Sequence, residues 1–306
     1  MKKTNTTKFD IHEEITKRIT EELEKGSIPW QKPWTTRATG ELFPCYSYAT
    51  KKRYDFINIM LLGGEPGEYA TFKQITDNGG KVKKGAKARF VVGWVVKDHA
   101  RKDADGNAII GEDGNPETYK TFGLRYYNVF NILTDVEGLE PKKNWTEPEE
   151  ANTVDPIESA EKIIHGYIDR PDAPTFTETT SNRAYYAPMT DEVVVPSKEQ
   201  FELIEEYYST AFHELTHSTM KANRCNREED RKGQKVAFGS ECYSKEELVA
   251  EIGAAALVNI AGIESEKSFR NSVAYIQSWL KALKDNPEMI VYASAQAQKA
   301  VDFILG

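Results

Sequence analysis

The stretch AFHELTHST, residues 211–219, decides how the second half of this chain is interpreted, because it holds two histidines at helical spacing. His213 and His217 are four residues apart, so on a helix their imidazoles project from one face. Two imidazole nitrogens so placed can reach one Zn²⁺ at roughly 2.0–2.1 Å. Glu214 lies about 100° further around the helix and is the expected general base toward water. The alternative is a polar helix face that binds no metal.

The residues before this stretch favour a helix that presents both histidines. Ser197, with Gln200 three residues later, is typical of a helix N-terminus. Apolar residues then recur on one helical face, at Phe201, Ile204, Tyr208, Phe212 and Leu215. We therefore expect a capped helix whose apolar face packs against a core.

A third metal ligand is expected in YSKEELVAEIGAAA, residues 243–256. Glu247 and Glu251 lie one helical turn apart, and small residues that permit close helix packing follow them. The pattern resembles the ligand helix of gluzincin metallopeptidases, which implies Glu247 as the ligand and Glu251 as the support of a histidine. Two alternatives stay open. Glu251 is itself the ligand, or Glu247 only completes a capping box with Ser244.

Three further features near this pattern have less specific interpretations. Tyr243 and Arg224 could stabilise an oxyanion at the metal, although structural or solvent-facing roles fit the sequence equally well. The segment DEVVVP, residues 191–196, resembles the edge strand on which zincins lay an extended peptide. A strand that only packs in the core is the alternative.

The composition excludes several classes of protein. The 306 residues are 39% hydrophobic and 29% charged, as in a globular protein, and the length favours two domains. No apolar run approaches 18 residues, so neither a membrane span nor a membrane partner is expected. The basic N-terminus is not followed by the apolar segment of a secretory signal. The cysteines lack CxxC spacing, which favours reduced thiols in the cytoplasm: Cys45, Cys225 and Cys242.

The first half of the chain has the character of a polyanion-binding module. The net charge of −8 comes from the second half, whereas residues 51–97 are rich in lysine and arginine. Phosphate contacts are expected of Lys73, Lys81, Lys83, Lys84, Lys87 and Arg89. Base stacking is considered for Trp30, Trp34, Phe72 and Trp94. A solvated face for the basic residues and core packing for the aromatic ones are the alternatives.

The order of elements predicts an α+β protein. A helix begins at Asp10 and ends at Gly26, and Val82 is expected to form a hairpin with a strand at 88–97. Residues 102–118 read as a polar hairpin loop before a strand at 119–132. The acidic, proline-bearing residues after Glu140 are typical of a linker. We therefore predict an α+β domain at 1–142, a linker at 143–156, and a mainly helical domain with a small edge sheet at 157–306.

Several segments, taken in order, resemble the ArdC-type antirestriction proteins. In the first half they are ITEELEKGSIPWQKPW (19–34), YDFINIMLL (54–62), YATFKQITDNGGKVKKGAKARFVVGW (69–94) and RYYNVFNI (125–132). In the second half they are YYAPMTDEVVVPSKEQF (185–201), YYSTAFHELTHST (207–219), FGSECYSKEELVAEIGAAAL (238–257) and WLKALKDNPEMIVYASAQAQKAVDFIL (279–305). The resemblance implies an N-terminal single-stranded-DNA-binding domain and a C-terminal zincin-like metallopeptidase domain.

The chain departs from the family in CYSYATKKRYDFIN, residues 45–58. Phe56 replaces a glycine, and Asp55 stands where a basic residue is usual, although Asn58 is retained. These changes concern the DNA contacts. The HELTH element and the downstream glutamates are intact, so the resemblance still implies a metal site.

The resemblance implies an antirestriction protein of a plasmid or other mobile element, which protects incoming DNA. Its partners would be single-stranded DNA and a restriction enzyme or other protein substrate, and its cofactor Zn²⁺ or another divalent metal. Two alternatives concern the role of the metal. In one, the protein is a DNA-binding shield whose metal site is structural or inactive. In the other, it is a regulatory metalloprotease directed to DNA-bound proteins.

Overall fold

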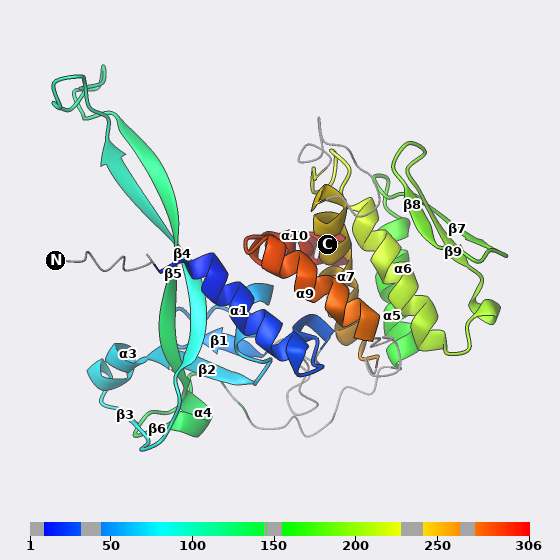
Figure 1. Cartoon of the computed structure of the whole chain (residues 1–306), viewed down its shortest axis with the longest axis horizontal. Helices are drawn as coiled ribbons and strands as arrows, with labels where there is room; N and C mark the ends of the chain where they lie inside the picture. Colours follow the sequence, from blue (N-terminus) through cyan, green and yellow to red (C-terminus); the bar gives the residue numbers. More distant parts are fainter. Residues whose placement is uncertain (1–8, 32–43, 144, 146–154, 228–240, 264–272) are drawn as a thin grey trace, which may run out of the picture.

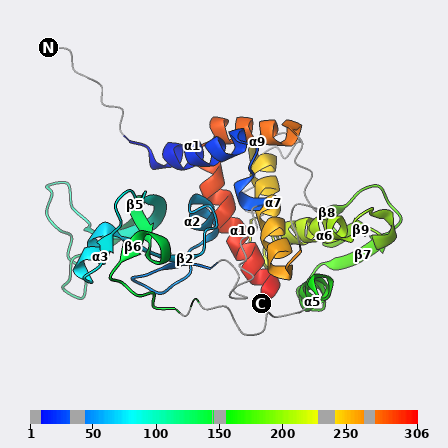
Figure 2. The same ribbon diagram turned by 90° about the horizontal axis from the view of Figure 1, so that it is seen from below.

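The computed structural model describes residues 9–31, 44–143, 145, 155–227, 241–263 and 273–306. It has the predicted α+β class, with a sheet-rich N-terminal half and a mostly helical C-terminal half that carries a small sheet (Figures 1 and 2). None of the helices in these ranges is long and apolar enough to cross a membrane.

The N-terminal half contains helices, short 3₁₀ turns (η) and strands in this order: α1 (Ile11–Glu24), η1 (Pro29–Gln31), β1 (Cys45–Ser47), α2 (Phe56–Leu61), β2 (Gly67–Thr71), α3 (Phe72–Asp77), β3 (Lys81–Val82), β4 (Arg89–Ala100), β5 (Thr118–Asn131), α4 (Ile132–Asp135) and β6 (Val136–Glu137). The C-terminal half contains α5 (Pro156–Ile168), β7 (Thr175–Thr179), β8 (Tyr185–Ala187), β9 (Glu192–Pro196), η2 (Lys198–Gln200), α6 (Ile204–Ser218), α7 (Glu241–Ala261), α9 (Val273–Asp285) and α10 (Met289–Leu305).

The main N-terminal sheet has the strand order β1-β2-β5-β4, in which β4 and β5 form the long hairpin that the sequence predicts. The expected pairing of Val82 with the strand at 88–97 is wrong. Strand β3 pairs with β6 instead, because Val82 packs with Ile75 and Val136 in a small separate cluster. Burial of this cluster outweighs the local preference for a hairpin.

The C-terminal sheet has the order β7-β9-β8, so the segment at 191–196 contains the central strand and not an edge. Strand β9 pairs in parallel with β7 and antiparallel with β8, and its three valines are nearly fully buried. A turn with Asp191 at φ 54° leads into this strand. The edge strand beside helix α6 is therefore β8.

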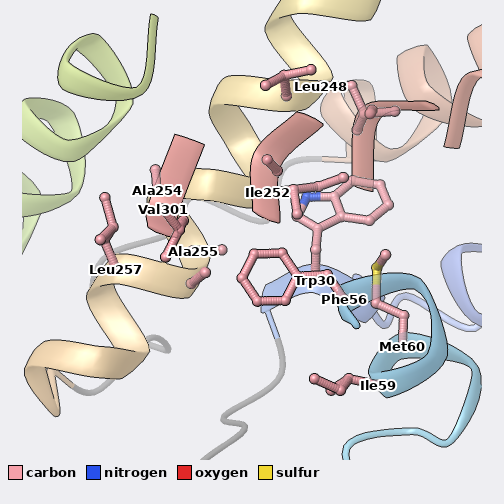
Figure 3. Packing of buried hydrophobic residues seen from close by; sticks show 14 of the residues in the cluster. Trp30, Phe56, Ile59, Met60, Leu248, Ile252, Ala254, Ala255, Leu257 and Val301 are labelled. Carbon is pink, nitrogen blue, oxygen red and sulfur yellow. The ribbon is translucent and has the colours of Figure 1, made fainter. Parts of the chain in front are cut away.

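One hydrophobic core joins the two halves of the chain (Figure 3). Phe56 and Met60 of α2 and Trp30 of η1 belong to the same cluster as Ile252 of α7. Trp30 is 0% exposed and lies edge-on to Trp279 of α9, with ring centroids 6.2 Å apart. The predicted linker between the halves falls mostly outside the described residues.

Candidate metal centre

Helix α6 carries both histidines but lacks the predicted cap. Ser197 precedes the short η2 turn, and α6 begins only at Ile204, after Leu203, with no side-chain cap. The chain is extended at Phe201, which separates the two helices. Burial holds α6 in place, because one face is at most 1% exposed: Tyr207, Tyr208, Ala211, Phe212 and Leu215.

His213, His217 and Glu247 form a triangle of possible metal ligands. The two Nε2 atoms lie 3.1 Å apart, and each lies 3.5 Å from a carboxylate oxygen of Glu247. A tetrahedral ion with bonds of about 2.0–2.2 Å has ligand atoms roughly 3.3–3.6 Å apart. The three side chains therefore fit one divalent metal ion and leave a further coordination position open.

The position of α7 favours Glu247 over its alternatives. The helix begins at Glu241, so Glu247 lies within it and is not the partner of a cap at Ser244. Glu251 lies one turn further along, where it acts electrostatically on His213 but does not belong to the triangle.

Gly253 lets helix α7 approach α6 closely enough for this contact. A Cβ at that position would lie 2.6 Å from Cγ2 of Thr216, which is closer than real side chains approach. Thr216 cannot turn away easily, because it is buried and its hydroxyl donates to the Phe212 carbonyl at 2.7 Å. The small residues that the sequence shows after the glutamates thus permit close packing, as expected.

A buried ion pair, which the sequence predictions did not include, supports His217. Nδ1 of His217 lies 3.2 Å from Oε1 of Glu246, and Arg227 donates to both oxygens of Glu246, at 3.0 and 2.7 Å. Burial would raise the pKa of Glu246, but Arg227 and His217 outweigh it and lower the pKa to about 2. Because Glu246 is then an acceptor only, the Nδ1 of His217 donates.

Acidic neighbours also dominate the electrostatics of His213. Burial lowers its pKa, but Glu247, Glu251 and Glu214 outweigh this effect and raise the pKa to about 9 in the metal-free chain. A proton on the imidazole competes with any ion for the same nitrogen.

Glu214, the expected general base, borders the same cleft as the candidate metal ligands. It is 9% exposed and lines a cleft of about 330 Å³ together with both histidines and Glu247. Residues of the β8 edge, among them Tyr185 and Tyr186, form another wall of the same cleft. The site therefore combines a metal-binding triangle, a carboxylate and an adjacent sheet edge.

Arg224 is not free to act as an oxyanion donor. Its fully buried guanidinium donates to both carboxylate oxygens of Asp191, at 2.9 and 2.8 Å, and to the carbonyls of Asp172 and Ser218. Arg224 thereby links the segment after α6 to Asp191 in the turn before β9. The side chain of Tyr243 lies outside the described part of the chain.

Several of the predicted DNA contacts have structural roles instead. The buried ring of Trp30 offers no face to a base. Arg89 forms ion pairs with Glu65 and Asp135, and Asn58 bonds to the backbone of Val92 in both directions. Trp34 lies outside the described residues.

The remaining basic candidates are on the surface. Lys73 pairs with Asp77 at 2.7 Å, and Lys83 donates to the Thr134 carbonyl at 2.9 Å. The other lysines of the set are also exposed: Lys81, Lys84 and Lys87. Two aromatic candidates, Phe72 and Trp94, are exposed as well.

Two protein-family models match the chain. Residues 9–130 match the N-terminal domain of anti-restriction factor ArdC, and residues 168–296 match a zincin-like metallopeptidase. Among solved structures, the antirestriction protein ArdC from plasmid R388 is similar in its metal-free form, with 29% identity and a TM-score of 0.67. Its Mn(II)-bound form gives 28% and 0.66, and each match covers 97% of both chains.

Curated relatives include two Escherichia coli proteins named DNA primase TraC, which are 34% and 33% identical over 97% of this chain. The chain spans only 20% and 27% of their lengths. Protein y4eC of Sinorhizobium fredii is 28% identical over 99% of this chain and 94% of its own length. The chain is thus ArdC-like and joins an ArdC N-terminal domain to a zincin-like metallopeptidase domain with a candidate His–His–Glu metal site.

Proposed function

We propose that this chain is an antirestriction protein of a mobile element that binds single-stranded DNA and hydrolyses peptide bonds at a zinc site. The observation that supports hydrolysis most strongly is the triangle of His213, His217 and Glu247 beside the buried carboxylate of Glu214. The similarity to ArdC of plasmid R388 supports the antirestriction role. Three N/O ligands with an open position are typical of catalytic zinc.

Each residue of the site has a separate role in the proposed peptide hydrolysis. His213, His217 and Glu247 would hold a divalent ion, which would polarise the substrate carbonyl and lower the pKa of water. Glu214 takes a proton from the attacking water on one carboxylate oxygen and delivers it to the amide nitrogen as the C–N bond breaks. Glu246 holds the His217 imidazole through Nδ1 throughout.

The substrate would bind as an extended segment along β8. This strand has β9 on one side only, and it borders the cleft that contains Glu214. An edge strand presents unpaired N–H and C=O groups to which a peptide can add. A restriction enzyme or another DNA-associated protein with an exposed loop would be suitable.

A protection assay in cells tests the proposal. Plasmid DNA would be transferred into restricting and non-restricting recipients that contain the wild-type chain or Glu214→Gln. We expect Glu214→Gln to keep its metal and its fold but to lose most protection. If Glu214→Gln protects as well as the wild type does, hydrolysis is not the means of protection.

That second outcome would favour a DNA-binding shield. The exposed lysines of the first half support this alternative, because they lie on the surface at 81, 84 and 87 without a carboxylate partner among the described residues. Elemental analysis of purified protein tests the metal separately. About one equivalent of zinc is expected in the wild type, with loss in His213→Ala.

A further inference from the structure

The outer part of the β4–β5 hairpin stands clear of the rest of the described chain (Figure 1). Residues directly opposite each other in such a pair share a face, and successive residues alternate between faces. The register from Arg89↔Val129 to Ala100↔Thr118 therefore assigns every residue to one of two faces. The basic face includes Lys97, His99, Tyr119, Arg125 and Tyr127. The apolar face includes Trp94, Val96, Phe122, Leu124 and Tyr126.

The two faces have opposite chemistry. On the apolar face, the charged residues are Asp98 and Lys120, which lie directly opposite each other. The basic face has no aspartate or glutamate at any paired position along the hairpin, whereas Lys97 and Arg125 are both exposed on it. On the outer part of the hairpin, a polyanion that follows this face therefore meets no carboxylate from β4 or β5.

The cations of the outer basic face are free to bind a ligand. Arg89 lies on the same face near the body of the protein, where Glu65 and Asp135 hold it. Lys97 and Arg125 have no ion pair or side-chain hydrogen bond with any other described residue. Their charge is thus not used within the described fold.

Aromatic rings lie at both ends of the basic face. Tyr119 is 47% exposed and stacks on His99 with ring centroids 5.3 Å apart, and Tyr127 is 41% exposed. The two tyrosines are eight positions apart along β5, which corresponds to roughly 27 Å. Between them, Gly123 leaves open space, since a Cβ there would meet nothing within 4 Å.

We propose that the basic face of the β4–β5 hairpin binds single-stranded nucleic acid, with Lys97 and Arg125 on phosphates and Tyr119 and Tyr127 stacked on bases. This inference rests on the proposed DNA binding and assigns it to a surface separate from the lysines at 81–87. Stacking requires bases whose faces are accessible, which favours a single strand over a duplex.

The test is fluorescence anisotropy of a labelled oligo(dT) with the full-length chain at several salt concentrations. Replacement of both cations, by Lys97→Ser and Arg125→Ser, should weaken binding at least tenfold. It should also reduce the salt slope by roughly 0.7 for each phosphate that the variant no longer neutralises. Tyr119→Ala and Tyr127→Ala should each weaken binding roughly five- to one-hundred-fold.

Matched controls exist on the opposite face of the same strand. Lys120→Ser and Phe122→Ala should bind oligo(dT) as the wild type does, and circular dichroism would verify that all variants are folded. Weaker binding by these controls, with unchanged binding by the basic-face variants, would overturn the proposal. So would unchanged binding by all of them, which would place the DNA elsewhere on the chain. A wild-type chain that binds no oligo(dT) would instead refute the proposed DNA binding itself.

Discussion

Glu246 bridges Arg227 and His217: its Oε1 atom lies 2.7 Å from Nη2 of the arginine and 3.2 Å from Nδ1 of the histidine. A hydrogen bond at Nδ1 fixes the tautomer of a neutral imidazole and leaves Nε2 unprotonated. That Nε2 atom is the one that faces His213 and Glu247. The buried carboxylate therefore prepares His217 to bind a metal ion.

Glu246→Gln should weaken metal binding while the three ligands stay in place. The amide is a weaker acceptor and can present its NH₂ group to Nδ1, so the tautomer is no longer fixed. Loss of such a supporting partner typically costs 10- to 100-fold in metal affinity. Competition with a chromophoric chelator, using Zn²⁺, measures the change.

Arg227→Met should lower metal affinity through the same carboxylate. Arg227 also donates to Thr219 and to the Thr216 carbonyl, so its loss should reduce stability as well. Adding Glu246→Gln to Arg227→Met should reduce affinity little further, because both changes act on one interaction.

Arg224→Met is the matched control for Arg227. Arg224 lies in the same segment after α6 as Arg227, and its side chain is also buried. It forms an ion pair with Asp191 and contacts none of the candidate metal ligands. We expect the substitution to lower the melting temperature and leave the metal affinity of the folded protein unchanged. An equal loss of affinity in Arg224→Met would mean that Arg227 acts only through general stability.

Gly253→Ala should push helix α7, which carries Glu247, away from helix α6. The added methyl group would overlap Thr216, and the shift moves Glu247 away from the histidines. Overpacking of this kind costs about 1–3 kcal/mol, and metal affinity should fall with it. Gly166→Ala in α5 is the control, because nothing lies within 4 Å of its Cβ position. It should stabilise the protein by roughly 0.5–1 kcal/mol and leave metal binding intact.

Because of the Asp191–Arg224 pair, the free energy of unfolding should fall as the pH is lowered into the acidic range. Burial raises the pKa of Asp191, but Arg224, Lys221 and Tyr186 outweigh it and lower the pKa below its usual value. A carboxyl with a lowered folded-state pKa stabilises the fold above the unfolded value of about 3.9, and this contribution is lost as the pH falls through the folded-state pKa.

Asp191→Asn removes this titration and keeps the backbone, because asparagine tolerates the positive φ of this turn. Urea unfolding at a series of pH values should show the wild type losing more stability below pH ~4 than the variant loses. Parallel curves for the two proteins would exclude Asp191 as a source of acid sensitivity.

Trp30→Ala should destabilise both halves of the chain together, by about 3–5 kcal/mol. Trp30→Phe should cost less, because it keeps most of the apolar contact and removes an indole N–H without a partner among the described residues. Unfolding monitored by bound metal and by circular dichroism should follow one transition. Two separate transitions would show that the halves fold independently.

Local patterns predicted much of this structure. The periodicity of the helices, the long hairpin and the spacing of His213 and His217 depend on neighbouring residues, so they are visible in the sequence. The predicted class and the resemblance to ArdC-type proteins are confirmed.

Features that depend on residues far apart in the chain were missed. For Trp30 the sequence leaves base stacking and core packing open, because only its distant contact with Trp279 shows that the ring is buried. For the strand at 191–196 the sequence leaves an edge strand and a core strand open, because nothing local reveals that β7 pairs with β9. The support of His217 by Glu246 depends on Arg227, which only the turn after α6 brings near. The single local signal was an acidic residue directly before Glu247.

The shared core of Figure 3 has a consequence for how such proteins evolve. A half transferred alone to another gene would carry an exposed apolar surface around Trp30 or along α7, and selection would act against it. We therefore expect the two halves to occur together in related proteins. The TraC proteins fit this expectation, since a part of each aligns with 97% of this chain, which includes both halves.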